Sequence, residues 1–330
     1  MGSDLSVHAR GRPAFITGGA SGIGLAVAHR CAQLRMSPIF LADIDEDRLT
    51  SAKRSVVQSA LGSGGLSEVV TLVADVASLA DNERVAAAVW DRTGGDLAFL
   101  FLNAGITTLR FGVEALWTTR PEDYRRVLSI DLDGVWFGIR NFVPRMIATG
   151  REGLVLSTAS VAGLMNSSDF TNFSYQIAKH GVVLMMELLA SGFAEKHPQL
   201  HAAVLCPFLT KTRIGQQARV QDAASAGVAP ANVPHADFIA AAVAQAEVPV
   251  SVLLARLEHE LRRGAFYIVS PDKTSDVEVV SARMRLKREA VELGLPPQMQ
   301  VPRHSPALRA AKAAREAAIK MGGPPPLAKL

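Results

Sequence analysis

The stretch that decides the fold is Thr17-Gly18-Gly19-Ala20-Ser21-Gly22-Ile23-Gly24. It follows a short apolar run, residues 14–17, and precedes a segment with helical periodicity that continues to Gln33. Small side chains let the backbone approach an anion closely, and a helix N-terminus directs N–H donors and partial positive charge at it. A plain turn between strand and helix is the alternative interpretation. An acid, Asp43, lies 19 residues after Gly24 and favours a dinucleotide site.

Strands and helices alternate outward from this stretch. Short β-rich apolar runs occur at residues 14–17, 38–42, 69–73, 97–102, 153–157, 202–205 and 265–269, with helical patterns between them, including 46–59, 80–91, 121–147, 174–196 and 236–263. Such alternation predicts βαβ units with right-handed crossovers. The expected fold class is α/β: a doubly wound parallel sheet of the Rossmann type, about seven strands, with helices on both faces and a basic helical and Pro-rich C-terminal tail.

Composition and charge exclude several classes of protein. The 330 residues are 48% hydrophobic and 20% charged, as expected for a globular chain without an obvious membrane span. The formal charge is +4, but residues 283–330 hold ten Lys/Arg and three Asp/Glu, so the body is slightly acidic. A nucleic-acid binder is therefore not expected. Two cysteines, Cys31 and Cys206, are too few for a disulfide scaffold or a metal site, and we expect buried thiols in a cytoplasmic protein.

The chain divides into two parts. Residues 1–271 are expected to form the catalytic Rossmann domain, and residues 272–330 a basic extension that is either partly disordered or in contact with another subunit. Residues 208–235 interrupt the alternation of strands and helices after the sixth strand. We expect the region 208–264 to cover the substrate, because α/β folds often place such loops at this edge of the sheet. An inert surface insertion is the alternative interpretation of that region.

Asp43 indicates which dinucleotide is bound. A carboxylate at the end of the second strand accepts hydrogen bonds from the adenosine ribose hydroxyls and repels a 2′-phosphate. Its neighbours Ser21 and Ile44 carry no positive charge that would offset this repulsion. The sequence therefore predicts NAD in preference to NADP.

A second motif, Ser174-Tyr175-Gln176-Ile177-Ala178-Lys179, places Tyr175 and Lys179 four residues apart on a predicted helix. Both side chains then project from one helix face. A nearby lysine cation favours the phenolate form of a tyrosine and would lower its pKa toward neutral pH. Ser160 follows the fifth strand and is placed to hold a substrate oxygen. Such a pair is common by chance, so its weight comes from its position behind the glycine-rich stretch.

Together these motifs resemble the short-chain dehydrogenase/reductase family, from about Pro13 to Val269. The resemblance implies catalysis by Ser160, Tyr175 and Lys179. It also implies cofactor contacts at Gly18, Ser21, Gly22, Ile23, Gly24, Asp43, Asp75, Val76, Asn103, Ala104, Gly105, Tyr175, Lys179, Pro207 and Thr212. Within the family, the chain is weakly similar to dehydrogenases that oxidise benzylic alcohols of lignin-derived aryl ethers.

Two positions depart from the family pattern. The family usually has an asparagine that shapes a helix bend and holds a water in a proton relay to the lysine, and Asp131 stands at that position here. A carboxylate would either accept from that water or pin Lys179 in a salt bridge. Phe208 replaces a glycine after the sixth strand, so it either narrows the pocket near the nicotinamide or adds an aromatic wall.

These features predict an NAD-dependent enzyme that moves a hydride to or from a secondary alcohol or ketone, without metal, nucleic acid or membrane. The residues expected around the substrate are apolar or aromatic, which suits a bulky, uncharged, aryl-bearing molecule: Leu164, Met165, Phe170, Phe173, Phe208 and Leu209. About half of them are equally consistent with core. The alternative function is a catalytically impaired NAD-binding sensor or subunit partner. The family resemblance also implies a homodimer or homotetramer.

Overall fold

A computed structural model of the chain describes residues 11–107, 116–165, 172–216, 218, 220, 223, 247–273 and 277–293. A seven-stranded parallel sheet forms its centre, in the order β3-β2-β1-β4-β5-β6-β7. The predicted fold class is confirmed, and strand boundaries agree with the sequence within about two residues. The strands are β1 Ala14–Thr17, β2 Ile39–Asp43, β3 Val69–Val73, β4 Phe99–Leu102, β5 Gly153–Thr158, β6 Leu200–Pro207 and β7 Tyr267–Ser270.

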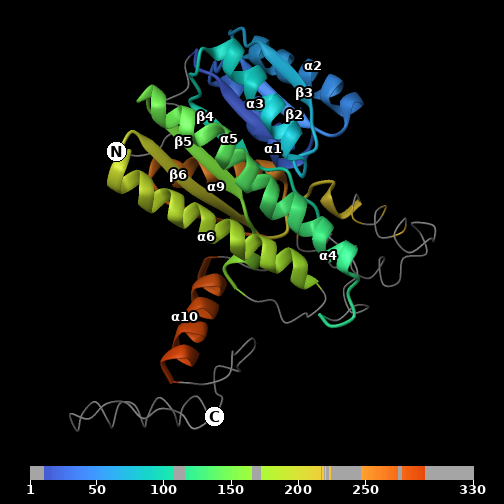
Figure 1. Cartoon of the computed structure of the whole chain (residues 1–330), viewed down its shortest axis with the longest axis vertical. Helices are drawn as coiled ribbons and strands as arrows, with labels where there is room; N and C mark the ends of the chain where they lie inside the picture. The colour runs from blue at the N-terminus through green and yellow to red at the C-terminus, as the bar shows by residue number, and fades with distance from the viewer. Residues whose placement is uncertain are drawn as a thin grey trace.

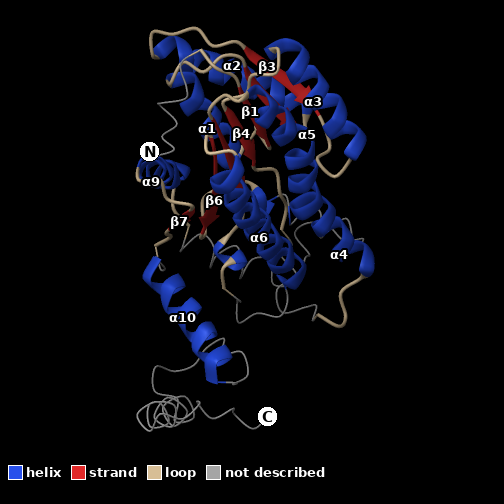
Figure 2. Cartoon of the chain, turned by 60° about the vertical axis from the view of Figure 1, so that its left-hand side comes forward, coloured by secondary structure: helices blue, strands red, loops and turns tan. Residues whose placement is uncertain are grey.

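Helices cover both faces of the sheet (Figures 1 and 2). The described helices are α1 Gly22–Gln33, α2 Glu46–Gly62, α3 Leu79–Thr93, α4 Pro121–Leu128, α5 Gly134–Thr149, α6 Phe173–Lys196, α9 Val250–Arg262 and α10 Val277–Leu293. One buried core unites the sheet with α1, α2 and α9, and the other unites it with α3, α5 and α6. The strands are therefore apolar on both faces, as parallel strands between helix layers must be.

Local sequence explains where the helices begin and end. Asp45 and Ser78 accept hydrogen bonds from the first-turn N–H groups of α2 and α3, so both helices are capped. Gly94 and Gly150 end α3 and α5 in the left-handed conformation that glycine adopts readily. These caps fix the lengths of the crossovers and hence the positions of the strand ends.

One expected helix differs from the prediction. The apolar pattern of residues 121–147 predicts one continuous helix, whereas the structure has α4, a π-helical segment Ser129–Asp133, and α5. Single π-helical turns widen a helix locally and are frequent at functional sites. Here the wider turn contains Asp131, which is fully buried.

The helix α6 is long and apolar enough to cross a membrane by length and composition. In this fold it packs against β6, and its residues Ala178, Val182 and Met186 are buried in the core. One face of this helix is therefore buried in the core, whereas other apolar side chains, such as Leu184 and Leu188, are exposed. By contrast, α10 extends away from the sheet (Figure 1), with Val280 buried at its start and Val291 78% exposed near its end.

Candidate active site

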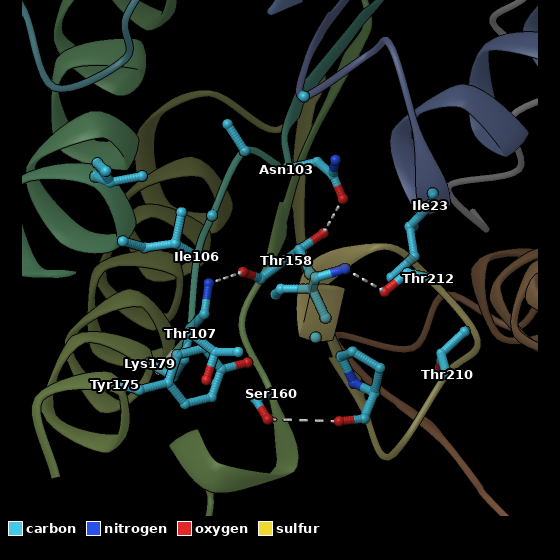
Figure 3. A pocket seen from close by; sticks show the side chains of 18 of the residues that line it. Ile23, Asn103, Ile106, Thr107, Thr158, Ser160, Tyr175, Lys179, Thr210 and Thr212 are labelled. Atoms are coloured by element: carbon cyan, nitrogen blue, oxygen red, sulfur yellow. Dashed lines mark hydrogen bonds between the residues drawn. The ribbon is translucent and has the colours of Figure 1, made fainter. Parts of the chain in front are cut away.

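A cavity of about 1060 Å³ opens at the carboxyl edge of the sheet, where the turns after β1 to β6 meet. Parallel α/β sheets bind ligands at this edge. Figure 3 shows Ser160, Tyr175 and Lys179 on one side of this cavity and Ile23, Thr210 and Thr212 on the other. The cavity brings together most residues predicted from the sequence: Gly18, Ser21, Gly22, Ile23, Asp43, Asp75, Val76, Asn103, Ala104, Gly105, Ser160, Tyr175, Lys179, Pro207 and Thr212.

The glycine-rich turn after β1 is packed too closely for side chains. Gly18 has a φ of +63°, and a Cβ there would lie 2.9 Å from Asn103 Nδ2. A Cβ on Gly24 would lie 2.2 Å from the Gly18 carbonyl oxygen, so Gly24 lets α1 pack directly behind the turn. Glycine is required at both positions for sterical reasons. Ser21, Gly22 and Ile23, at the start of α1, line the cavity.

Asp43 lies at the end of β2 and lines the cavity. Its Oδ2 accepts from the Ala20 N–H (3.2 Å) and its Oδ1 from the Asp45 N–H (3.2 Å). Burial raises the pKa of Asp43, and these backbone donors oppose the increase. The carboxylate therefore anchors the glycine-rich turn to β2 while it faces the cavity.

Asn103 joins the glycine-rich turn to the fifth strand. Its Nδ2 donates to the Thr17 carbonyl (3.1 Å), and its Oδ1 accepts from Thr158 Oγ1 (3.0 Å). Thr17 Oγ1 in turn accepts from the Asn103 and Ala104 N–H groups (2.9 and 3.1 Å). These bonds cross-link the ends of β1, β4 and β5, which holds the cavity wall rigid.

Ser160, Tyr175 and Lys179 converge as predicted. Ser160 follows β5, and its Oγ accepts from the Ala162 N–H (3.2 Å) and donates to the Pro207 carbonyl (3.5 Å). Lys179 Nζ lies 5.4 Å from the centre of the Tyr175 ring and donates to the Thr158 carbonyl (3.1 Å). Figure 3 shows the three side chains pointing into one region of the cavity. A hydroxyl and a phenol beside a fixed cation can hold and protonate a substrate oxygen.

Asp131 stands behind Lys179 and outside the cavity wall. Its Oδ2 lies 3.0 Å from Lys179 Nζ, and its Oδ1 accepts from the Ile106 N–H (2.8 Å). The Asp131 side chain is 0% exposed and that of Lys179 is 4% exposed. Of the two alternatives for this carboxylate, the structure has the salt bridge.

Electrostatics at this cluster differ from the prediction in one respect. Burial raises the pKa of Tyr175, Lys179 lowers it, and Asp131 raises it again, so the net pKa lies above the ordinary value. The sequence predicts that Lys179 brings this pKa down; its charge acts in that direction but is outweighed in the protein alone. Burial by itself would lower the pKa of Lys179, yet Asp131 and Tyr175 raise it above its ordinary value. Lys179 is therefore a cation at neutral pH.

The residues expected around the substrate divide into two groups. Met165, Phe208 and Leu209 line the cavity. Phe208 also packs against the core, and its backbone N–H donates to the Ser270 carbonyl of β7 (3.0 Å). Leu164, however, is 7% exposed within the core, and Phe173 stacks on Tyr124 of α4 at 5.8 Å. The prediction of these two as pocket residues is corrected accordingly, and Phe170 lies outside the described residues.

Sequence reasoning missed four contributors to the site. Thr158 supplies both the carbonyl that accepts from Lys179 and the hydroxyl that donates to Asn103. Thr107 accepts from Asn172 (3.1 Å), and Gly163 packs against the Lys179 backbone. Thr158 ends β5, two residues before Ser160, so its position at a strand end could have identified it from the sequence. The other contacts depend on tertiary structure.

The donor set fits a dinucleotide. A turn without room for side chains, a helix N-terminus directed at the cavity and a carboxylate at the next strand end are the three parts that such a cofactor requires. Within the described part of the chain, no three His, Cys, Asp or Glu side chains gather closely enough to hold a metal ion.

Two known enzymes are similar to this chain in sequence. Levodione reductase from Leifsonia aquatica is 35% identical over 172 residues, or 52% of this chain and 60% of that enzyme. Cyclohexanol dehydrogenase from Acinetobacter sp. (strain SE19) is 34% identical over 185 residues, or 56% of this chain and 67% of that enzyme. The matches thus span about two thirds or less of these relatives.

A solved structure extends the similarity to nearly the whole fold. A short chain dehydrogenase/reductase from Burkholderia phymatum in complex with NAD superposes with a TM-score of 0.73 at 28% identity, over 90% of this chain and 99% of that one. The family model for short chain dehydrogenases matches residues 12–223. This chain therefore belongs to the short-chain dehydrogenase family.

Proposed function

We propose that this protein is an NAD-dependent oxidoreductase that interconverts a secondary alcohol and its ketone. The observation that carries the proposal is the convergence of Ser160, Tyr175 and Lys179 on one wall of the cavity, opposite the glycine-rich turn. The similarity to a cyclohexanol dehydrogenase and a levodione reductase supports the same class of reaction.

Each of the three side chains has a separate role. Ser160 holds the substrate oxygen, where negative charge develops. Tyr175 removes the hydroxyl proton during oxidation and returns a proton during reduction. Lys179 provides the positive charge that favours the phenolate, and it binds the cofactor ribose. The nicotinamide ring, when bound, accepts or supplies the hydride.

Asp43 supports NAD as the cofactor. Its carboxylate lines the cavity at the end of β2, and the adjacent Ile44 is 70% exposed and uncharged. A 2′-phosphate at this place would meet a negative charge without a neighbouring cation to offset it. The solved structure from Burkholderia phymatum contains NAD.

The substrate is proposed to be bulky and uncharged. Val161, Met165, Phe208 and Leu209 line the cavity near Ser160 and Tyr175, and all four are apolar. Such a wall favours an alicyclic or aryl-bearing group beside the reacting carbon. Benzylic alcohols of aryl ethers are the narrowest expectation within this class and remain a prediction.

The Asp131 ion pair motivates an alternative function. A Lys179 held by a carboxylate fits a chain that binds NAD but turns over poorly, as a sensor or a subunit partner. Turnover that increases in Asp131→Asn at all pH values would favour this alternative. Turnover by the unmodified chain would favour the enzyme.

The assay is NADH formation over a panel of alkyl, alicyclic and aryl secondary alcohols, with NAD and NADP tested separately. We expect turnover with NAD that falls by about four orders of magnitude or more in Tyr175→Phe, because the phenol is the proposed acid and base. NAD binding should be nearly unchanged in that variant. Tyr267→Phe is the matched control, since Tyr267 lies 45% exposed on β7. Equal activity of Tyr175→Phe and the unmodified chain would refute the assignment.

The remaining expectations complete the proposal. We propose a cytoplasmic homodimer or homotetramer that contacts its partners through α5 and α6. The exposed faces of these helices carry large apolar side chains: Trp136, Ile177, Leu184 and Leu188 are 42–65% exposed. Residues 1–271 form the proposed catalytic domain, and β7 ends at Ser270, directly before the boundary of the 272–330 extension.

A further inference from the structure

The carboxylate of Asp131 faces two buried groups at once. The Ile106 N–H donates to Oδ1, and the Lys179 ammonium forms an ion pair with Oδ2, which has no hydrogen-bond partner among the described residues. A carboxylate accepts at both oxygens, whereas an asparagine amide accepts at one and presents donors at the other. The surroundings of residue 131 are therefore matched to an aspartate, although the family usually has asparagine there.

The contact between Asp131 and Lys179 is direct. The separation of 3.0 Å leaves no space for a water molecule between Oδ2 and Nζ. Gly105 closes the remaining side, because a Cβ there would lie 3.1 Å from Asp131 Oδ2 and 3.2 Å from Lys179 Nζ. In this chain the ion pair occupies the place where the family resemblance implies a water-mediated relay.

The Lys179 ammonium has neighbours both inside the protein and at the cavity. It donates to the Thr158 carbonyl and forms an ion pair with Asp131 Oδ2. Its Nζ also lies 5.4 Å from the centre of the Tyr175 ring, and Lys179 and Tyr175 both line the cavity. The Tyr175 phenol and the Asp131 carboxylate thus compete for one positive charge.

Few other titratable groups of the described residues lie near Asp131, Tyr175 and Lys179. On β6, Cys206 is the other titratable neighbour, and burial raises its pKa to about 12, so it is neutral under ordinary conditions. The strand β5 and the 3₁₀ turn Val161–Gly163 contain no titratable side chain. On α4, Arg126 lines the cavity, Tyr124 stacks on Phe173, and the acidic residues pair with Arg120: Glu122 and Asp123. Asp131 is thus the anion closest to Lys179 among these groups.

We propose that Asp131 is a positioning residue, which fixes Lys179 in a direct buried ion pair and withdraws part of its charge from Tyr175, so that alcohol oxidation is adapted to alkaline conditions. This inference rests on the proposed function. The Asp131 oxygen lies within about 8.4 Å of the Tyr175 ring centre, judged from the two separations that involve Lys179 Nζ. At that distance, with an effective dielectric constant of about 20, one charge changes a pKa by roughly 1.5.

The first experiment compares the pH dependence of kcat for alcohol oxidation in the unmodified chain, Asp131→Asn and Asp133→Asn. We expect the pH at which kcat reaches half its maximum to fall by about 1–2 pH units in Asp131→Asn. Asp133→Asn removes the same charge from an exposed position in the same π-helical segment, so its profile should not move. An unchanged or higher value in Asp131→Asn would overturn the inference.

A second experiment measures the pKa of Tyr175 directly, without a need for turnover. The chain has only three tyrosines, so the ultraviolet difference between the unmodified protein and Tyr175→Phe isolates the phenolate of Tyr175. Tyr267 does not interfere below high pH, because its pKa is raised to about 12 by burial and by Glu187. We expect Tyr175 to titrate above its ordinary value in the unmodified protein, and about 1–2 pH units lower in the Asp131→Asn background.

The two experiments separate the two proposals. A Tyr175 titration near neutral pH in the unmodified protein would overturn the role of Asp131, even if the enzyme is active and even if Asp131→Asn does not fold. Absence of turnover in the unmodified chain, together with the expected titration, would refute the proposed function and leave the ion-pair effect standing.

Discussion

The packing of Gly163 against α6 gives the sharpest test of the site geometry. Gly163 ends the 3₁₀ turn that follows Ser160. A Cβ at this position would lie 2.5 Å from the Lys179 carbonyl oxygen, 2.8 Å from its carbonyl carbon and 3.0 Å from Val183 Cγ2. The first two atoms are backbone in the middle of a helix, so they cannot rotate away. Gly163→Ala must therefore push the turn that carries Ser160 away from the helix that carries Tyr175.

The size of the displacement sets the expected loss. Carbon and carbonyl oxygen approach to about 3.3 Å at closest, so the turn must move by roughly 0.8 Å. A misplacement near 1 Å costs about 100-fold in rate, and overpacking costs about 1–3 kcal/mol of unfolding free energy. We expect kcat/KM to fall by about two orders of magnitude, while the affinity for NAD changes by a few-fold at most, since the glycine-rich turn is untouched.

The same substitution at Gly192, which lies on α6 itself, provides the control. Gly192 has no atom within 4 Å of the position its Cβ would take. Gly192→Ala should keep full activity and stabilise the fold by about 0.5–1 kcal/mol, because alanine loses less backbone entropy in a helix. The measurements are steady-state kinetics, calorimetric NAD binding and urea unfolding of both variants. Equal kcat/KM in Gly163→Ala and the unmodified chain, or a loss of NAD affinity as large as the loss of rate, would refute the reasoning.

Two further changes test the cofactor site and the core. Asp43→Ser removes the charge that opposes a 2′-phosphate, so the ratio of kcat/KM for NADP to that for NAD should rise at least tenfold; a constant ratio would contradict the role of Asp43. Burial raises the pKa of Cys31 to about 12 from 9.0, so its contribution to stability is complete below about pH 9 and is lost as the pH rises toward 12. Cys31→Ala should therefore reduce the alkaline slope of the unfolding free energy by about 1.4 kcal/mol per pH unit in denaturant titrations, and an unchanged slope would count against it.

Local chemistry made part of this structure predictable. The glycine-rich turn, Asp43 and the Tyr175–Lys179 pair lie in short segments whose neighbours in sequence are also their neighbours in space. Strand ends followed from apolar runs that are buried on both faces. For these features the local sequence is enough to predict how the side chains lie.

The rest depended on contacts between distant segments. The apolar pattern across Asp131 is continuous, so nothing local indicates a π-helical turn or the choice of a salt bridge over a water contact. Phe173 begins α6 and was expected at the substrate, but Tyr124 of a different helix provides its stacking partner. Phe208 lines the cavity and packs against the core, and its backbone N–H bonds to Ser270 of β7, a strand about 60 residues further along the chain.

No single segment of the chain forms the cavity. Its walls come from the ends of β1, β4, β5 and β6 and from α6, which are separated by up to about 190 residues and meet only when the central strands are paired in order. A partly folded chain therefore cannot bind the cofactor, and binding must report on global unfolding. Cofactor at 100 times its dissociation constant would raise the free energy of unfolding of the domain by about 2.7 kcal/mol. The cellular supply of cofactor is thus part of what sets the lifetime of the folded enzyme.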